Sequence, residues 1–141
     1  MAQRAARFAD VISPTEPPGH RHPGLYIAQA PGRGRGVFCA ADITAGALIE
    51  VCPVIVLPKG DLERVHATRL HDYYFLWAGE GETAIALGFG SLYNHADDSN
   101  ADYEMHFAEE TLHVIAERDI PAGEEICIDY TDGQDRSTLW F

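Results

Sequence analysis

The sequence predicts a mainly β fold in one domain with one short helix, and two observations support this prediction. From Leu25 onward, short apolar runs alternate with Gly, Pro and Asp, a pattern typical of short strands joined by tight turns. Only one segment has helical spacing, so the strand–helix–strand rhythm that builds a parallel sheet is missing. A chain of 141 residues suits one sizeable core and leaves little room for a second.

The predicted strands are short runs with apolar residues at alternating or consecutive positions, each bounded by turn residues. In chain order they cover residues 25–29, 36–40, 48–57, 83–87, 103–107, 111–116 and 126–130. The predicted helix covers residues 61–73, and Asp61 is well placed to begin it. Its helical spacing is carried by Leu62, Val65, Arg69 or Leu70, and Tyr73.

The sequence also contains a weak internal repeat. Residues 42–49 (DITAGALI) and 119–126 (DIPAGEEI) share the pattern D-I-x-A-G-x-x-I. In each copy the glycine supplies the backbone freedom of a tight turn between two predicted strands. The repeat predicts two similar strand–turn–strand units that face each other.

The ends of the chain differ from its centre. Residues 1–24 are rich in Pro and Gly and have little periodicity, which predicts an extended arm over the surface. The predicted domain covers residues 25–132, and a short C-terminal segment covers residues 133–141. No apolar run reaches the roughly 18 residues that a membrane span needs, and no long apolar segment of the kind found in secretory signals follows Arg4 and Arg7.

The cysteines predict a reducing environment. Cys39, Cys52 and Cys127 are odd in number, widely spaced and without a C-x-x-C pair, so neither a disulfide framework nor a structural zinc cluster follows from them. We therefore expect an intracellular protein. Its compactness and few lysines favour the cytoplasm.

The charge of the chain narrows the choice of partners. Asp plus Glu outnumber Lys plus Arg by 22 to 10, and the formal net charge is −12. Such a surface repels phosphate backbones, so nucleic acid is a poor candidate partner. It attracts basic, lysine-bearing proteins or peptides, although acidity can equally serve solubility alone.

The first motif is the glycine-rich segment PGRGRGVF, residues 31–38. Alternating glycines let the backbone approach a ligand closely. The spacing G-x-G-x-G, followed by a strand and a turn, excludes a dinucleotide fingerprint, which requires a helix there. A surface loop is the other interpretation of this segment.

The second motif is GSLYNHADDSNA, in which Asn94 and His95 supply many hydrogen-bond donors and acceptors. A calcium loop beginning at Asp98 fails because Tyr103 replaces the required glycine. The histidines of this region, His95, His106 and His113, do not have a recognisable zinc-ligand spacing. If the stretch is buried, its polar groups must find partners, and a polar ligand could supply them.

The third motif is EEICIDY, a predicted strand that Tyr130 closes. A tyrosine at a strand end usually serves packing, and its phenol matters chemically only if it lies in a pocket near a reactive atom.

Together, GRGRGVF, NHADDSN and DIPAGEEICIDY, in this order, resemble the SET-domain protein lysine methyltransferases. The likeness covers residues 25–132, and three motifs in order are far more specific than any one of them. The resemblance implies several small, curved sheets of the β-clip type. It also implies a pseudoknot in which the C-terminal segment threads under a preceding loop, an exception to the usual unthreaded connections. This threading would bring Asn94 and Tyr130 together.

The resemblance further implies a seat for S-adenosylmethionine and no metal. In the family, backbone groups of the glycine-rich segment hold the methionine part, and an Asn-His pair binds near the methionine end and the adenine. The matching residues are Arg33, Gly34, Arg35, Asn94 and His95. Many relatives carry a Cys-rich, zinc-binding segment after the domain, which this chain lacks. Trp140 and Phe141 could cover the cofactor instead, or a second subunit of a homodimer could complete the cleft.

Tyr130 matches the family's catalytic tyrosine, whose hydroxyl would orient the lysine amine and the methyl group. A general-base role is less attractive, because a phenol with a pKa near 10 is mostly protonated at neutral pH. The resemblance places Tyr93 and Ile128 in a lysine channel that opens on the opposite face. Relatives often carry Phe or Tyr where Ile128 stands, and the missing hydroxyl favours transfer of more than one methyl group. Val51 replaces a frequent channel tyrosine, which affects the choice of substrate.

These observations favour an S-adenosylmethionine-dependent enzyme that methylates lysine side chains of a basic protein or peptide, with neither nucleic acid nor membrane as a partner. The alternative is a non-catalytic module of the same fold that binds basic protein tails. A methyltransferase acting on small-molecule amines and an unrelated β-rich carbohydrate binder are further hypotheses.

Overall fold

The computed structural model describes residues 19–79 and 81–130. The predicted mainly β fold is confirmed: this part of the chain contains nine strands and one α-helix. The strands are β1 (Leu25–Ala30), β2 (Gly34–Cys39), β3 (Leu48–Leu57), β4 (Tyr74–Trp77), β5 (Glu82–Ala86), β6 (Asn94–His95), β7 (Ala101–His106), β8 (Thr111–Ala116) and β9 (Glu125–Ile128). The helix is α1 (Leu62–His66), and short 3-10 turns lie at Lys59–Asp61, Arg69–Asp72 and Gly90–Leu92.

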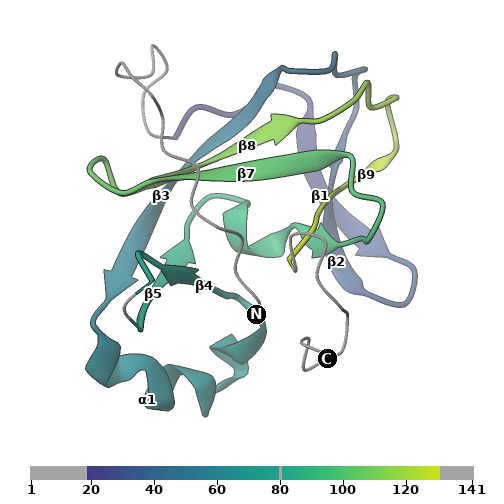
Figure 1. The fold of residues 1–141 in the computed structure, drawn as a ribbon. Helices are drawn as coiled ribbons and strands as arrows, with labels where there is room; N and C mark the ends of the chain where they lie inside the picture. Colours follow the sequence, from purple (N-terminus) through teal and green to yellow (C-terminus); the bar gives the residue numbers. More distant parts are fainter. Residues whose placement is uncertain (1–18, 80, 131–141) are drawn as a thin grey trace.

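The strands form two sheets. One has the order β1-β2-β9-β6 and the other the order β4-β5-β3-β8-β7. In Figure 1, β3, β8 and β7 run together across the molecule, the first sheet lies at one side and α1 lies at the opposite end. Strand β3 pairs with β8 through its first half and with β5 through its second half, and its register with β8 shifts between Leu48 and Glu50. Such a shift bends a strand, which suits small curved sheets.

Strand β9 lies between β2 and β6. It pairs antiparallel with β2, where Val37 faces Ile126, and parallel with β6, where Asn94 faces Cys127 and His95 faces Ile128. The second and third sequence motifs are therefore direct neighbours, as the resemblance implies. Parallel partners cannot be joined by a tight hairpin, so the β7–β8 hairpin intervenes between them.

The internal repeat forms two turns that hold each other. Ile43 and Ile120 exchange both backbone hydrogen bonds, with N–O distances of 2.9 and 2.8 Å. The Asp119 carboxylate accepts a hydrogen bond from the Ala45 amide at 2.8 Å, and the Asp42 carboxylate accepts one from the Ala122 amide at 2.9 Å. The prediction of two facing strand–turn–strand units is confirmed.

The predicted helix over residues 61–73 is wrong in its length. Only Leu62–His66 is α-helical, and Asp61 precedes it without a side-chain capping bond. Thr68 has an extended backbone, and its hydroxyl donates to the Val65 carbonyl at 2.7 Å and accepts from the Leu70 amide at 3.1 Å. A hydroxyl that satisfies nearby backbone groups competes with helix continuation, so the chain restarts as a 3-10 turn.

Part of the predicted arm is described. The amide of Gly19 donates to the Val51 carbonyl at 2.9 Å, and the Val51 amide donates to the His20 carbonyl at 2.8 Å. Residues 19–22 thus extend along the first half of β3. Residues 1–18 of the arm and the C-terminal segment 133–141, with Trp140 and Phe141, lie outside the described residues. No helix of the described chain is long and apolar enough to cross a membrane.

Two buried histidines stack on each other between β7 and β8. The rings of His106 and His113 lie 3.7 Å apart between centroids and are inclined by 13°. The Nε2 atom of His113 is buried and has no hydrogen-bond partner in the described part of the chain. Burial, and secondarily the proximity of His106, lowers the pKa of His113 to about 4. Protonation of this ring is therefore disfavoured in the folded chain.

This lowered pKa predicts a pH-dependent stability. In the unfolded chain His113 takes up a proton near its ordinary pKa of about 6.5, whereas the folded chain takes it up only near pH 4. The free energy of unfolding should therefore fall by about 3 kcal/mol as the pH drops through this window, and level off below it. Urea denaturation of the native chain and of His113→Phe, which keeps a ring in the stack, measures this slope. An equal slope in both proteins would contradict the prediction.

Candidate functional site

The three sequence motifs meet around β9. The side-chain amide of Asn94 donates to the Arg35 carbonyl at 3.1 Å and to the Glu125 carboxylate at 2.7 Å. One amide therefore joins the glycine-rich segment, the Asn-His pair and the last strand. Amide groups that satisfy partners on several segments fix their relative positions.

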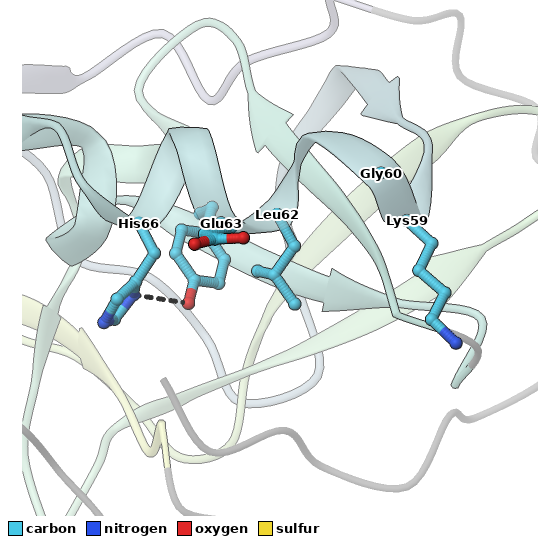
Figure 2. A pocket seen from close by; sticks show the side chains of 6 residues that line it. Lys59, Gly60, Leu62, Glu63 and His66 are labelled. Carbon is cyan, nitrogen blue, oxygen red and sulfur yellow. Dashed lines mark hydrogen bonds between the residues drawn. The ribbon is translucent and has the colours of Figure 1, made fainter.

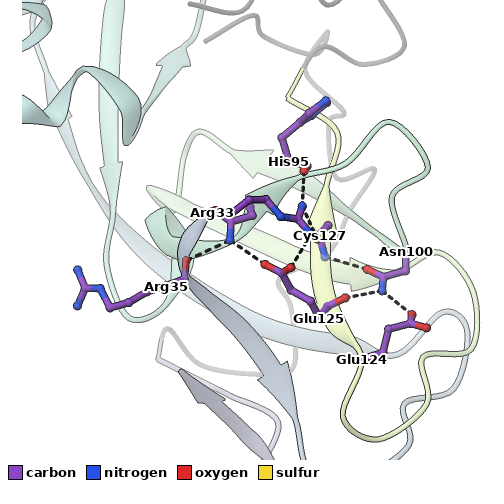
Figure 3. Close-up of polar contacts among 8 residues, drawn as sticks. Arg33, Arg35, His95, Asn100, Glu124, Glu125 and Cys127 are labelled. Carbon is purple, nitrogen blue, oxygen red and sulfur yellow. Dashed lines mark hydrogen bonds and ion pairs between the residues drawn. The ribbon is translucent and has the colours of Figure 1, made fainter. Parts of the chain in front are cut away.

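Arg33 enters the same cluster through its side chain. Its guanidinium donates to the His95 carbonyl at 2.9 Å and to the Glu125 carboxylate at 2.7 Å. Figure 3 shows this guanidinium between the two acceptors, whereas the side chain of Arg35 points away from them. The Cys127 thiol lies 3.7 Å from the guanidinium. Burial, then the nearby Glu125 charge, raises the pKa of Cys127 to about 11, which keeps this thiol neutral.

Two glycines of the first motif have different roles. Gly34 has a φ of +73°, and within residues 19–79 and 81–130 no atom lies within 4 Å of the place that a side chain would occupy. Its left-handed conformation favours glycine. At Gly36, by contrast, a Cβ atom would overlap the Glu125 carboxylate. Gly36 thus lets β2 lie close against Glu125.

His95 supports the backbone of Tyr130. Its Nδ1 atom accepts a hydrogen bond from the Tyr130 amide at 3.0 Å, and its Nε2 atom lies 2.8 Å from an Asp97 carboxylate oxygen. Because Nδ1 accepts, the ring proton resides on Nε2 and is donated to Asp97. The rings of His95 and Tyr130 lie 5.3 Å apart between centroids.

The phenol of Tyr130 is buried and directed at the second motif. Its hydroxyl donates to the backbone carbonyl of Tyr93, and both residues are buried together with Ile128. Burial raises the pKa of the Tyr130 phenol above its ordinary value. At neutral pH this group is therefore a neutral hydroxyl in a fixed orientation.

Sequence reasoning assigned no role to Asn100, although it stands in the second motif. Its buried amide donates to the Glu124 carboxylate and to the Glu125 carbonyl, both at 2.8 Å, and accepts from the Cys127 amide at 2.9 Å. Figure 3 shows Asn100 beside β9 and facing Glu124. Asn100 therefore fixes the beginning of β9 through these three hydrogen bonds, an arrangement called the Asn100 clamp below. The signal available in the sequence was a second amide six positions after Asn94.

A separate hollow lies beside α1. Its volume is about 790 Å³, and it is lined by Lys59, Gly60, Leu62, Glu63, His66 and Tyr74. Figure 2 shows the five labelled residues, Lys59 to His66, along the 3-10 turn and the helix. The His66 imidazole lies 3.0 Å from the hydroxyl of Tyr74, which belongs to β4. Among the described residues, none of the site residues expected from the sequence lines this hollow.

The chain is similar to known proteins over most of its length. The family model described as SET domain matches residues 34–131. A histone-lysine N-methyltransferase of Schizosaccharomyces pombe, specific for H3 lysine 37, is 34% identical over 119 residues, which are 83% of this chain and 76% of that protein. The N-lysine methyltransferase KMT5A of Xenopus tropicalis is 29% identical over 122 residues, and the match covers 77% of this chain but only 36% of that protein.

Solved structures share the fold. A structure from Plasmodium falciparum, described as a candidate histone methyltransferase, superimposes with a TM-score of 0.64 at 32% identity and covers 76% of this chain and 92% of that one. A second structure, from work on the product specificity of histone lysine methyltransferases, has a TM-score of 0.68 at 23% identity. It covers 81% of this chain and 52% of that one.

The clamp at Asn100 yields a prediction about stability. The substitution Asn100→Ala should lower the free energy of unfolding by at least about 2 kcal/mol, because it leaves the buried Cys127 amide and Glu125 carbonyl without partners. Asn100→Asp should be at least as harmful, since its carboxylate would face the Glu124 carboxylate. Urea denaturation measures both variants. A loss below about 0.5 kcal/mol in both would show that the clamp does not support β9.

Proposed function

The chain belongs to the SET-domain family, and we propose that it transfers methyl groups from S-adenosylmethionine to lysine side chains of a histone or a similarly basic protein. The observation that carries this proposal is the buried Tyr130 phenol, held on the Tyr93 carbonyl beside the Asn94–His95 strand. The S. pombe relative is named for a histone lysine. A basic substrate also complements the net charge of −12.

The residues around β9 fit the proposed cofactor. The described residues leave the space at the side-chain position of Gly34 empty, and Arg33 and Glu125 place a cation and an anion next to each other. Such a set complements the carboxylate and the ammonium group of an amino-acid tail. We assign Arg33, Gly34, Arg35, Asn94 and His95 to this seat. When bound, S-adenosylmethionine supplies an electrophilic methyl group on a cationic sulfonium.

The chain's own residues then position the amine. The Tyr130 hydroxyl donates a hydrogen bond to the Tyr93 carbonyl, which leaves lone pairs on the phenol oxygen that can accept a hydrogen bond from a lysine amine. Its raised pKa argues against proton abstraction by a phenolate at neutral pH. We assign orientation of the amine to Tyr130, in keeping with catalysis by alignment.

We assign the walls of the lysine channel to Tyr93 and Ile128. Both are fully buried, and an apolar channel lowers the pKa of an entering lysine, which must lose its proton before it can accept a methyl group. Ile128 offers no hydroxyl to hold a water molecule next to the amine. We therefore propose that more than one methyl group can be added. The cytoplasmic location and a homodimer stay predictions from the sequence.

Cofactor binding should depend on Asn94. The substitution Asn94→Ala removes the amide that joins Arg35 and Glu125, so we expect the dissociation constant for S-adenosylmethionine to rise at least about tenfold, the loss of one good hydrogen bond. Calorimetry measures this constant. Gln29→Ala, which removes an exposed amide on edge strand β1, serves as the control. An unchanged affinity in Asn94→Ala would remove the cofactor assignment.

Methyl transfer should depend on the Tyr130 hydroxyl. We expect Tyr130→Phe to lower kcat by about a hundredfold, the typical contribution of one oriented catalytic group, while cofactor affinity is kept. The matched control is Tyr26→Phe, the same change at an exposed position of β1. Lys59 is the only lysine in the chain, so assays in a Lys59→Arg background exclude methylation of this side chain. Cofactor binding without transfer to any protein of a lysine-rich panel would favour the non-catalytic module.

A further inference from the structure

A buried carboxylate lies behind the Tyr93–Tyr130 contact. We propose that Glu50 is a positioning residue for the Tyr130 hydroxyl, acting through the side chain of Tyr93. This inference rests on the proposed function. It concerns a residue of β3 that hydrogen-bonds to Tyr93 and Phe89 and faces Arg21.

Glu50 is the meeting point of three segments. It is 1% exposed, and one carboxylate oxygen accepts a hydrogen bond from the Tyr93 hydroxyl at 2.7 Å. The other oxygen accepts from the Phe89 amide at 3.0 Å and lies 3.5 Å from the Arg21 guanidinium. A buried carboxylate is tolerated only with such partners, and loss of any of them is costly.

Tyr93 uses both of its polar ends in this arrangement. Its side-chain hydroxyl donates a hydrogen bond to Glu50, and its backbone carbonyl accepts a hydrogen bond from the Tyr130 hydroxyl. Burial, and secondarily the charge of Glu50, raises the pKa of the Tyr93 phenol, so this hydroxyl remains a donor. The bond to Glu50 holds the ring of Tyr93 in place, and thereby restrains the Cα atom next to the carbonyl that Tyr130 binds.

The loop before Tyr93 is pressed against the same carboxylate. Gly88 has a φ of +64°, and a Cβ atom there would overlap the Glu50 carboxylate. At Gly90 a Cβ atom would come within 2.9 Å of the Cys52 sulfur. These close approaches leave the backbone from Gly88 to Tyr93 little freedom. The position of the Tyr93 carbonyl is thus set from β3.

Arg21 connects this arrangement to residues 19–22. Its guanidinium lies 3.9 Å from the centroid of the Phe89 ring, and its side chain is 39% exposed. Arg21 therefore supplies a positive charge next to the Glu50 carboxylate. It also packs on the ring of Phe89, whose backbone amide donates to the same carboxylate. The ordered contacts run from Arg21 through Glu50 and Tyr93 to Tyr130.

The test compares kcat, KM and cofactor affinity in Tyr93→Phe and Glu50→Gln, both close in shape to the native residues. We expect kcat to fall at least about tenfold, because a small misplacement of a reacting group has effects of this size, while the cofactor dissociation constant from calorimetry stays within about twofold of the native value. Unchanged kcat in both variants would overturn the proposal. If Glu50→Gln does not fold, Tyr93→Phe, which keeps the ring, decides alone.

A glycine pair provides a matched backbone test. Gly88→Ala places a methyl group on the Glu50 carboxylate, whereas Gly46→Ala, at a φ of +85°, meets nothing within 4 Å. Both variants strain a left-handed backbone, but only the first displaces Glu50. We expect kcat to fall in Gly88→Ala and to stay near the native value in Gly46→Ala. An equal effect in both would show that backbone strain alone, and not Glu50, alters the rate.

A double-variant cycle separates positioning from general support of the fold. If Glu50 and Tyr93 act through the Tyr130 hydroxyl, Tyr93→Phe should cause no further loss of kcat in a Tyr130→Phe background. An equal fold-loss in both backgrounds would overturn the proposal. If the native chain methylates no protein, the proposed function fails, and the melting temperatures of the same four proteins still test the contact. A double variant that shifts the Tm by less than the sum of the single shifts supports it, and additive shifts overturn it.

Discussion

Strand β9 hydrogen-bonds to β2 on one side and to β6 on the other, and these two neighbours carry the glycine-rich segment and the Asn94–His95 pair. The backbone pairing is short, since β6 has only two residues. Side-chain hydrogen bonds therefore add to the few backbone hydrogen bonds that hold β9 in place. Asn94 and Asn100 both donate to Glu125, the first residue of β9, and His95 accepts the amide of Tyr130 beyond the other end of the strand. Because β9 lies between its two partners, it brings the third motif into contact with the other two.

Two of the few arginines in this acidic chain form ion pairs with buried or half-buried carboxylates of β3 and β9. Arg33 lies 2.7 Å from Glu125, and Arg21 lies 3.5 Å from Glu50. Removal of a carboxylate from water costs several kcal/mol unless a cation and hydrogen bonds replace the lost hydration. Each pair joins segments that are distant in sequence, so each constrains geometry more than it adds net stability. These two ion pairs therefore favour one arrangement of the segments that they join.

The sequence allowed the strands to be predicted best where apolar residues run without interruption. Residues 48–57 and 111–116 coincide with β3 and β8. A short, continuous apolar run bounded by turn residues is typical of a buried strand. The two-residue strand β6 could not be found, since its pairing with β9 is a tertiary contact without a local pattern. The helix over 61–73 was overestimated because Thr68 satisfies nearby backbone groups with its own hydroxyl.

The sequence motifs of the site could be predicted, but the residues that hold those motifs in position could not. Asn94, His95 and Tyr130 stand in short patterns, and the structure brings them together. The contribution of Glu50 depends on Phe89 and Tyr93, which are 39 and 43 positions away, and a single sequence does not show which distant residues meet. The side chain of Arg33 on the His95 carbonyl was missed for the same reason. The roles of these residues toward the cofactor, and the domain limits 25–132, stay predictions.

The two reciprocal turns around Ile43 and Ile120 bear on how the chain matures during translation. Their Asp carboxylates reach amides 74 and 80 positions away, so the first turn has no stable partner until the second has left the ribosome. Folds dominated by such distant pairings assemble slowly. In the interval, the nascent chain exposes the strands that later form its core, a stage at which aggregation competes with folding. Chaperones that shield apolar segments should therefore have their greatest effect on this protein before synthesis is complete.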